Sequence, residues 1–225
     1  MKYHVPEKLN HDLTAAAIVD SNALPWTPSP LSGVERRFLE RDGGEVARAT
    51  SIVRYAPGSA FSPHVHDKGE EYLVLSGVFS DENGAFAAGT SVRNPPGSRH
   101  GPFTRDGCVI FVKLRQMADS EREARIVRTG DVEALPTGID GLSRIALHGG
   151  KSGEQVSIDM LEPGAQWRDR GRTSGEEILV LQGSLLYGDR RCEAGTWLRF
   201  PPGQERPLAS VTGCRLWAKR GHLPG

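Results

Sequence analysis

Short apolar runs alternate with turn-forming residues along almost the whole chain. The runs are rich in Val, Ile, Leu, Phe and Thr, and 27 Gly and 15 Pro separate them. The clearest runs cover residues 49–55, 71–79 and 108–114 in the first half, and 155–161, 177–186 and 215–218 in the second. This pattern predicts many short β-strands joined by tight turns. One short polar stretch, residues 120–125, predicts a helical turn capped by Asp119 or Ser120.

The second half of the chain repeats the first at a fixed offset. Residues 58–108 match residues 164–214 without insertion or deletion, and every landmark moves by 106 positions. Most landmarks are Gly and Pro, which fix turn conformations, so the same turns are made twice. We therefore expect a duplicated fold. Its parts are an N-terminal tail (1–17), a first repeat (18–117), a linker (118–125) and a second repeat (126–225).

The first repeat carries three histidines and a carboxylate at suggestive spacings. His64 and His66 are two residues apart on an expected strand, so their side chains share one face, about 6.6 to 6.8 Å apart along it. Glu70 follows beyond a tight turn, and His100 follows a Pro-Pro-Gly turn. Three imidazoles and one carboxylate suit Zn, Fe, Mn, Ni, Co or Cu better than Ca or Mg. This set predicts a site for one divalent transition metal.

The carboxylate ligand is expected at Glu70 and not at Glu71. Successive strand residues point to opposite faces, so Glu71 shares its face with the apolar Leu73 and Leu75.

Two further residues are candidates for catalysis, because they are polar in the first repeat and apolar in the second. Tyr72 corresponds to Ile178, and Arg54 corresponds to Met160. Tyr72 shares the strand face of Glu70 and could serve as a hydrogen-bond donor or acid. Ordinary sequence drift would explain each difference equally well.

The equivalent ligand positions of the second repeat hold Arg170, Arg172, Glu176 and Arg206. Arginine stays protonated and has no lone pair to give a metal, so the second repeat has lost its site. It is then expected to fold without an ion, which indicates that the metal of the first repeat serves chemistry or sensing more than folding. The arginines and Glu176 allow two interpretations. They form either a buried ion cluster that fills the old metal cavity, or a pocket for a carboxylate or phosphate.

Composition excludes several classes of function. Lys and Arg together number 28, as do Asp and Glu, so no broad basic surface is expected and nucleic acid is not an expected partner. The N-terminus lacks the apolar core of a signal peptide, and no apolar run approaches the length of a membrane span, which predicts a cytoplasmic protein. Cys108, Cys192 and Cys214 are odd in number and widely spaced, so they are expected to be small buried hydrophobes.

The spacings of the first repeat resemble those of the cupin superfamily, from about residue 18 onward. The first cupin motif is matched by Gly58, His64, His66, Glu70 and Gly77. The second is matched by Gly89, Pro95, Gly97 and His100, although Thr104 stands where the family usually has Asn. The resemblance implies an all-β fold of tandem jelly-roll barrels of the double-stranded β-helix type, a bicupin. It also implies a metal held by the three histidines and Glu70 of the first barrel.

Within the cupins, the first repeat is most similar to the metal-binding cupin domain of the anti-sigma factor ChrR. Residues 33–37, 49–58, 69–82 and 93–98 carry this similarity. Full anti-sigma members have an N-terminal helical domain with a zinc cluster of His and Cys. Here no cysteine precedes Cys108, so inhibition of a sigma factor is not expected.

Two classes of function follow from this resemblance. The first is an oxygen-dependent dioxygenase that acts on a small carbonyl or phenolic compound. The alternative is a non-catalytic, metal-dependent sensor or regulatory cupin related to the ChrR domain. The family resemblance favours the sensor, whereas the missing anti-sigma domain favours the enzyme, although a fold does not fix a function. An exposed edge of the tandem barrels also leads us to expect a homodimer.

Overall fold

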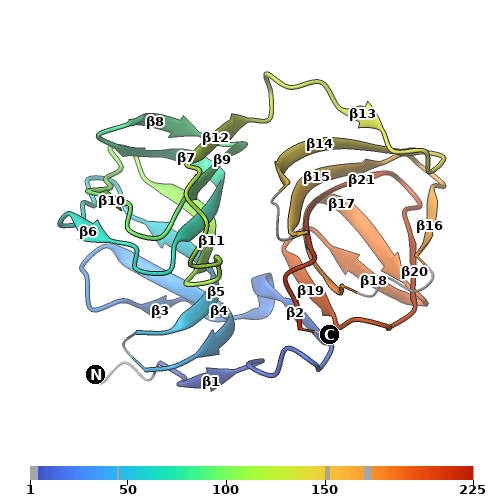
Figure 1. Cartoon of the computed structure of the whole chain (residues 1–225), viewed down its shortest axis with the longest axis horizontal. Coiled ribbons are helices and arrows are strands. Elements are labelled where there is room, and N and C mark those ends of the chain that lie inside the picture. Colours follow the sequence, from blue (N-terminus) through green and yellow to red (C-terminus); the bar gives the residue numbers. More distant parts are fainter. Residues whose placement is uncertain (1–4, 45, 150–152, 170–173, 225) are drawn as a thin grey trace. The chain divides into compact units, whose positions relative to one another are not determined.

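The chain forms two compact units built almost entirely of antiparallel β-strands (Figure 1). The computed structural model describes residues 5–44, 46–149, 153–169 and 174–224; the side chains of residues 168 and 169 are not described. The first unit contains the chain up to residue 11 and residues 24–130, and the second contains residues 12–23 and the chain from residue 131. This arrangement confirms the all-β bicupin fold expected from the sequence.

The first unit is a curved sheet with a small two-stranded ladder. Its strands are β1 (Lys8–Leu9), β3 (Thr27–Pro28), β4 (Val34–Asp42), β5 (Arg48–Tyr55), β6 (His64–Val65), β7 (Glu70–Asp81), β8 (Gly84–Ala87), β9 (Thr90–Asn94), β10 (Arg99–His100), β11 (Cys108–Leu114) and β12 (Arg125–Arg128). The main order is β1-β4-β5-β11-β7-β9-β12, and β6 pairs with β10. Val34, Val53, Val74 and Phe79 belong to the core that the sheet surrounds.

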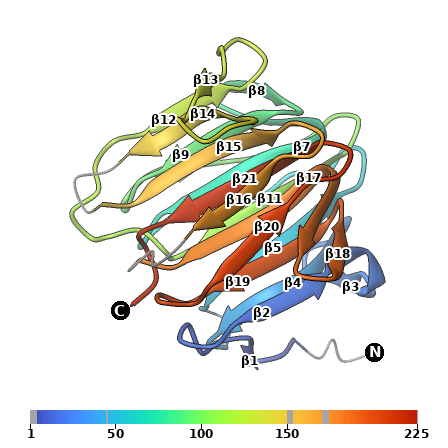
Figure 2. The same cartoon turned by 90° about the vertical axis from the view of Figure 1, so that its right-hand side faces the viewer.

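The second unit repeats this order with its own strands (Figure 2). Its elements are β2 (Ala17–Asp20), the single helical turn η1 (Ser21–Ala23), β13 (Leu135–Pro136), β14 (Leu142–Gly149), β15 (Gln155–Leu161), β16 (Gln166–Asp169), β17 (Glu176–Tyr187), β18 (Arg190–Glu193), β19 (Thr196–Phe200), β20 (Arg206–Ala209) and β21 (Cys214–Arg220). The main order is β13-β14-β15-β21-β17-β19-β2, and β16 pairs with β20 as β6 pairs with β10. The core includes Trp167, Ile178 and Leu216.

All six expected strands are present, but the expected helix is not. Residues 119 and 120 form a turn, and β12 begins at Arg125. The prediction of a helical turn was wrong because residues 125–128 pair with β9 instead, and this ladder outweighs the weak local preference of a short polar segment. The three cysteines are buried and free, as expected. No helix in the described part of the chain is long and apolar enough to span a membrane.

The compact units differ from the expected boundaries of 18–117 and 126–225 at the start of each repeat. Strand β2 pairs with β19 of the second unit, with Ile18 opposite Leu198. Strand β12 pairs with β9 of the first unit, with Ile126 opposite Val92. The first strand of each repeat therefore completes the sheet of the other unit. Sequence similarity between the two strands cannot show this exchange, because each would fit either sheet.

One pair of glycines shows why the two repeats share their turns. Gly77 and Gly183 both have a φ of 72°. A Cβ atom would lie 2.2 Å from the carbonyl oxygen of Gly107 in the first unit, and 2.3 Å from that of Gly213 in the second. Only glycine fits this positive φ and this close approach, so both long strands bend at the same point.

Candidate metal centre

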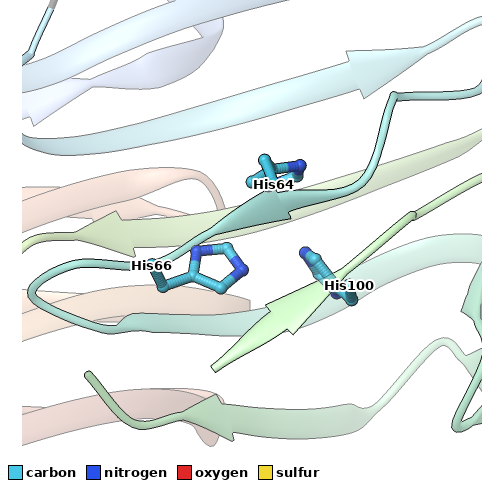
Figure 3. Close-up of side chains that lie close together, drawn as sticks. All are labelled: His64, His66 and His100. Carbon is cyan, nitrogen blue, oxygen red and sulfur yellow. The ribbon is translucent and has the colours of Figure 1, made fainter. Parts of the chain in front are cut away.

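The ladder of β6 and β10 brings three histidines of the first unit together. His64 lies opposite His100, and His66 follows directly after β6. One ring nitrogen of each residue lies within 4.8 Å of the other two. Figure 3 shows the three rings converging. This group could hold one metal ion.

Glu70 lies beside the histidines at the start of β7. Its Oε2 atom is 3.6 Å from Nε2 of His66 and 3.4 Å from Nε2 of His100. Asn94 donates a hydrogen bond of 3.1 Å to the same oxygen. Glu71 is also buried, but it pairs with Arg93 at 3.2 Å. The alternation of the strand therefore places Glu70 at the histidine cluster and Glu71 on the other face.

The orientation of the imidazoles fits a metal ion. Nδ1 of His100 lies 2.9 Å from Oδ2 of the buried Asp81, and Nδ1 of His64 lies 3.1 Å from the carbonyl oxygen of Ser62. Each of these contacts assigns the ring proton to Nδ1 and leaves the lone pair of Nε2 for a metal. Within the described residues, the buried Nε2 atoms of His66 and His100 have no hydrogen-bond partner. Converging nitrogen atoms without partners are what a metal site requires.

Electrostatics favour the neutral imidazole that a metal needs. Burial lowers the pKa of His66, and the neighbouring His100 and His64 lower it further, although Glu70 opposes them. A neutral ring keeps its lone pair available, so no proton must leave before an ion binds.

Sequence reasoning missed Asp81 and Asn94, the residues that hold His100 and Glu70. Their equivalents in the second repeat are Tyr187 and Phe200. Both positions are thus acidic or amide in the repeat with the histidines and aromatic in the other. The comparison that selected Tyr72 and Arg54 would have found them if it had been applied to every position.

A cavity of about 460 Å³ adjoins the cluster within the first unit. His64, His66 and Glu70 lie in its wall. Most of the remaining lining is apolar or aromatic, including Phe38, Val53, Tyr55, Phe61, Phe79 and Val112. The volume and the lining are typical of a site for a small molecule.

The two candidate catalytic residues lie in different places. Tyr72 is buried, its ring packs edge-on against Phe79, and its hydroxyl has no hydrogen-bond partner among the described residues. Burial and the nearby carboxylates of Glu70 and Asp81 raise the pKa of Tyr72 far above its usual value. Arg54 is exposed and pairs with Glu35, with Nε and Oε2 3.0 Å apart. The structure therefore places Tyr72 near the cluster, but Arg54 on the outer face of the sheet.

The second unit holds a buried ion cluster at the equivalent position. Nη1 of Arg206 lies 2.8 Å from Oε2 of Glu176, and Nε of Arg220 lies 2.6 Å from Oε1 of Glu176. Arg220 also contacts Asp159, which accepts two further hydrogen bonds from Arg144. Arg170 and Arg172 lie outside the described residues. For Arg206 and Glu176, the geometry supports an ion cluster in place of a metal site.

Taken together, two jelly-roll units and one histidine cluster define the chain as a bicupin whose first unit could hold a metal ion. The profile of the ChrR cupin-like domain matches residues 14–118 and, a second time, residues 122–224. The chain therefore belongs to the family of ChrR cupin-like domains.

Solved structures share the fold at low sequence identity. A protein from Nostoc punctiforme PCC 73102 that has been suggested to be a dioxygenase superposes with a TM-score of 0.75 at 14% identity, over 92% of this chain and 82% of that one. The bacterial pirin YhhW from Escherichia coli, in complex with nickel(II), gives 0.70 at 10% identity, over 93% and 100%. A point mutant of salicylate 1,2-dioxygenase from Pseudoaminobacter salicylatoxidans gives 0.60 at 13% identity, over 76% and 69%. No curated protein matches the sequence.

Proposed function

We propose that the chain is a mononuclear metal-dependent dioxygenase that acts on a small carbonyl or phenolic compound. The observation that carries the proposal is the position of His64, His66 and Glu70 in the wall of a cavity large enough for such a compound. Two similar folds, those from Nostoc and Pseudoaminobacter, are described as dioxygenases, the first of them only by suggestion, which adds support.

The four residues His64, His66, Glu70 and His100 would hold one divalent transition metal. If the ion is six-coordinate, four protein ligands would leave up to two positions for substrate, oxygen or water. A dioxygenase places both atoms of O2 in its product, so the reaction needs no external reductant. The surrounding side chains would exclude water from the reacting centre, because Phe61, Phe79 and Val112 give the cavity an apolar wall.

Tyr72 would contribute as a hydrogen-bond donor. Its raised pKa keeps the phenol protonated at neutral pH, so it cannot serve as a base. Its hydroxyl lies among the charges of Glu70 and Asp81 and makes no hydrogen bond to the described residues. We propose that it donates a hydrogen bond to a substrate oxygen held beside Glu70, from a position behind the cavity wall, since Tyr72 does not itself line the cavity.

Oxygen uptake after metal analysis tests the proposal. Protein stripped with EDTA is reloaded separately with Fe(II), Mn, Co, Ni, Cu or Zn, and oxygen consumption is followed with acetylacetone and with gentisate. We expect uptake that requires both metal and organic substrate and that is lost in His64→Ala. The Tyr72→Phe variant should keep its metal but lose turnover, whereas Arg54→Gln, on the outer face, should change neither. Tightly bound zinc with no uptake on either compound would contradict a dioxygenase.

A second candidate function is a metal-dependent sensor or regulator without catalysis. The observation that favours it is the match of both repeats to the ChrR cupin-like domain. The test is to purify a partner with metal-loaded protein and to repeat the purification with His64→Ala. A partner held only by the loaded wild type would support the sensor, and an equal yield with both proteins would count against it. The expected homodimer also stays a prediction, which light scattering can check.

A further inference from the structure

Among the residues that the structure describes, the wall of the first unit's cavity carries more positive than negative charge. Two guanidinium groups, those of Arg36 and Arg41, lie in its wall. A third, that of Arg115, is matched by Asp67, with which it pairs. Among the described residues, the only other carboxylate in the wall is Glu70, at the histidine cluster. In the described part of the chain, no carboxylate forms an ion pair with Arg36 or Arg41.

The duplication shows what Arg36 lacks. Its equivalent in the second repeat is Arg144, which lies opposite Asp159 on the neighbouring strand and binds it through two hydrogen bonds of 2.6 and 2.8 Å. In the first repeat, Arg36 lies opposite Val53 on the neighbouring strand. The arginine is present in both copies, but its carboxylate partner is present only in the copy without the histidines.

Two residue differences between the repeats explain why the cavity of the first unit is open whereas the equivalent space in the second unit is filled. Asp159 and Arg220 of the ion cluster correspond to Val53 and Leu114, which line the cavity of the first unit. The apolar pair leaves space where the second unit has a closed network. Arg36 therefore faces that space, and burial lowers its pKa, although the nearby Tyr55 opposes this shift.

A bulge in β4 brings the guanidinium group of Arg41 into the cavity wall beside that of Arg36. Phe38 lies opposite Ser51 and Glu40 opposite Thr50, so the strand gains one residue between these pairs. The extra residue shifts the alternation, so that Arg41 joins Phe38 in the cavity wall while Glu40 pairs with Arg48 on the other face. The second repeat has a bulge at the same point, but Gly149 occupies the position of Arg41.

We propose that Arg36, supported by Arg41, forms a binding site for the carboxylate of a small apolar or aromatic acid. A guanidinium presents paired N–H donors that match a carboxylate, and the aromatic wall formed by Phe38, Tyr55 and Phe61 would hold the body of the acid. The inference names the substrate class of the proposed dioxygenase and rests on that function for its catalytic meaning. The binding step itself requires only the arginines and the cavity.

Calorimetric titration with benzoate tests the site, and benzamide serves as the neutral control of the same shape. Metal-free protein is used first, because a carboxylate can also ligate a metal directly. We expect benzoate to bind the metal-free protein at least about tenfold more tightly than benzamide. Arg36→Gln should weaken benzoate binding roughly ten- to a hundredfold, the effect of losing a charge-assisted hydrogen bond. Arg37→Gln is the matched control, since Arg37 stacks over Trp26 at 4.3 Å and does not line the cavity.

Adding the missing carboxylate to the first repeat, opposite Arg36, gives an independent test. Val53→Asp restores the partner that Arg144 has in the second unit, so it should abolish benzoate binding as Arg36→Gln does. Circular dichroism verifies that each variant is folded, and if Val53→Asp does not fold, Arg36→Gln alone decides. Benzoate binding that survives in Arg36→Gln, or that appears only after metal is added, would overturn the proposal. Failure of oxygen uptake would leave these titrations unchanged, so the two proposals can fail separately.

Discussion

At the scale of single residues, the contact between Asp81 and His100 decides how the proposed metal ligand is presented. Both side chains are buried, and the contact assigns the proton of the ring to Nδ1. Carboxylates in this position typically change metal affinity by about 10- to 100-fold. We therefore expect Asp81→Asn to weaken binding of Zn or Co by about that factor, measured by competition with a chromophoric chelator. Asp106→Asn removes one exposed charge from the same unit and should leave affinity unchanged. Equal affinities of the two variants would contradict this role.

The sequence predicts some of these residues better than others. His64, His66 and Glu70 could be placed on one side of the site because strand alternation and turn spacing determine where their side chains point. The direction of Arg54 could not be predicted by comparing residue types alone. Arg54 neighbours the inward-facing Val53, so it points outward and pairs with Glu35. Arg36 and Tyr55 were not predicted as cavity residues. Whether they line a cavity depends on the residues that lie opposite them on neighbouring strands, and those pairings are not known from the sequence.

At the scale of elements, the turns predicted most reliably are those fixed by glycine. Gly77 allows β7 to bend at the carbonyl oxygen of Gly107, whereas Gly58 has a similar φ of 76° but would place a Cβ atom in open space, with no other atom within 4 Å. Gly58→Ala should therefore lower the free energy of unfolding by about 1 to 2 kcal/mol, from backbone strain alone. Gly77→Ala should lower it by about 2 to 5 kcal/mol, because a steric clash is added to that strain. Urea denaturation measures both values, and equal losses would show that the close approach does not matter.

The exchange of β2 and β12 marks the limit of prediction at this scale. The apolar residues Ile18 and Ile126 predict a strand at the start of each repeat, and the pairing supplies one. Which sheet receives the strand depends on the path of the connections between the repeats. Local residue patterns predict strands and turns, because these are local properties. They do not predict the path of the connections, so the exchange could not be predicted.

At the scale of the whole molecule, the two repeats place the same carboxylate, Glu70 in the first and Glu176 in the second, in opposite surroundings. Glu70 lies among imidazoles and receives one hydrogen bond from Asn94. Glu176 is fully buried between the guanidinium groups of Arg206 and Arg220. We propose that the first carboxylate accepts a cation from outside the chain. The second already has its cations within the chain, so its unit can fold without a metal.

The same substitution at these two positions should therefore have opposite effects. Glu176→Gln removes the negative charge that lies between the buried guanidinium groups of Arg206 and Arg220, and we expect it to lower the free energy of unfolding by about 3 to 5 kcal/mol while metal affinity stays unchanged. Glu70→Gln removes a buried carboxylate that has no cation in metal-free protein, so stability should stay the same or rise, whereas metal affinity should fall. Urea denaturation of metal-free protein and chelator competition give the four values. If Glu70→Gln destabilised the metal-free chain as much as Glu176→Gln does, both carboxylates would be structural. That result would contradict the proposal that Glu70 is a metal ligand.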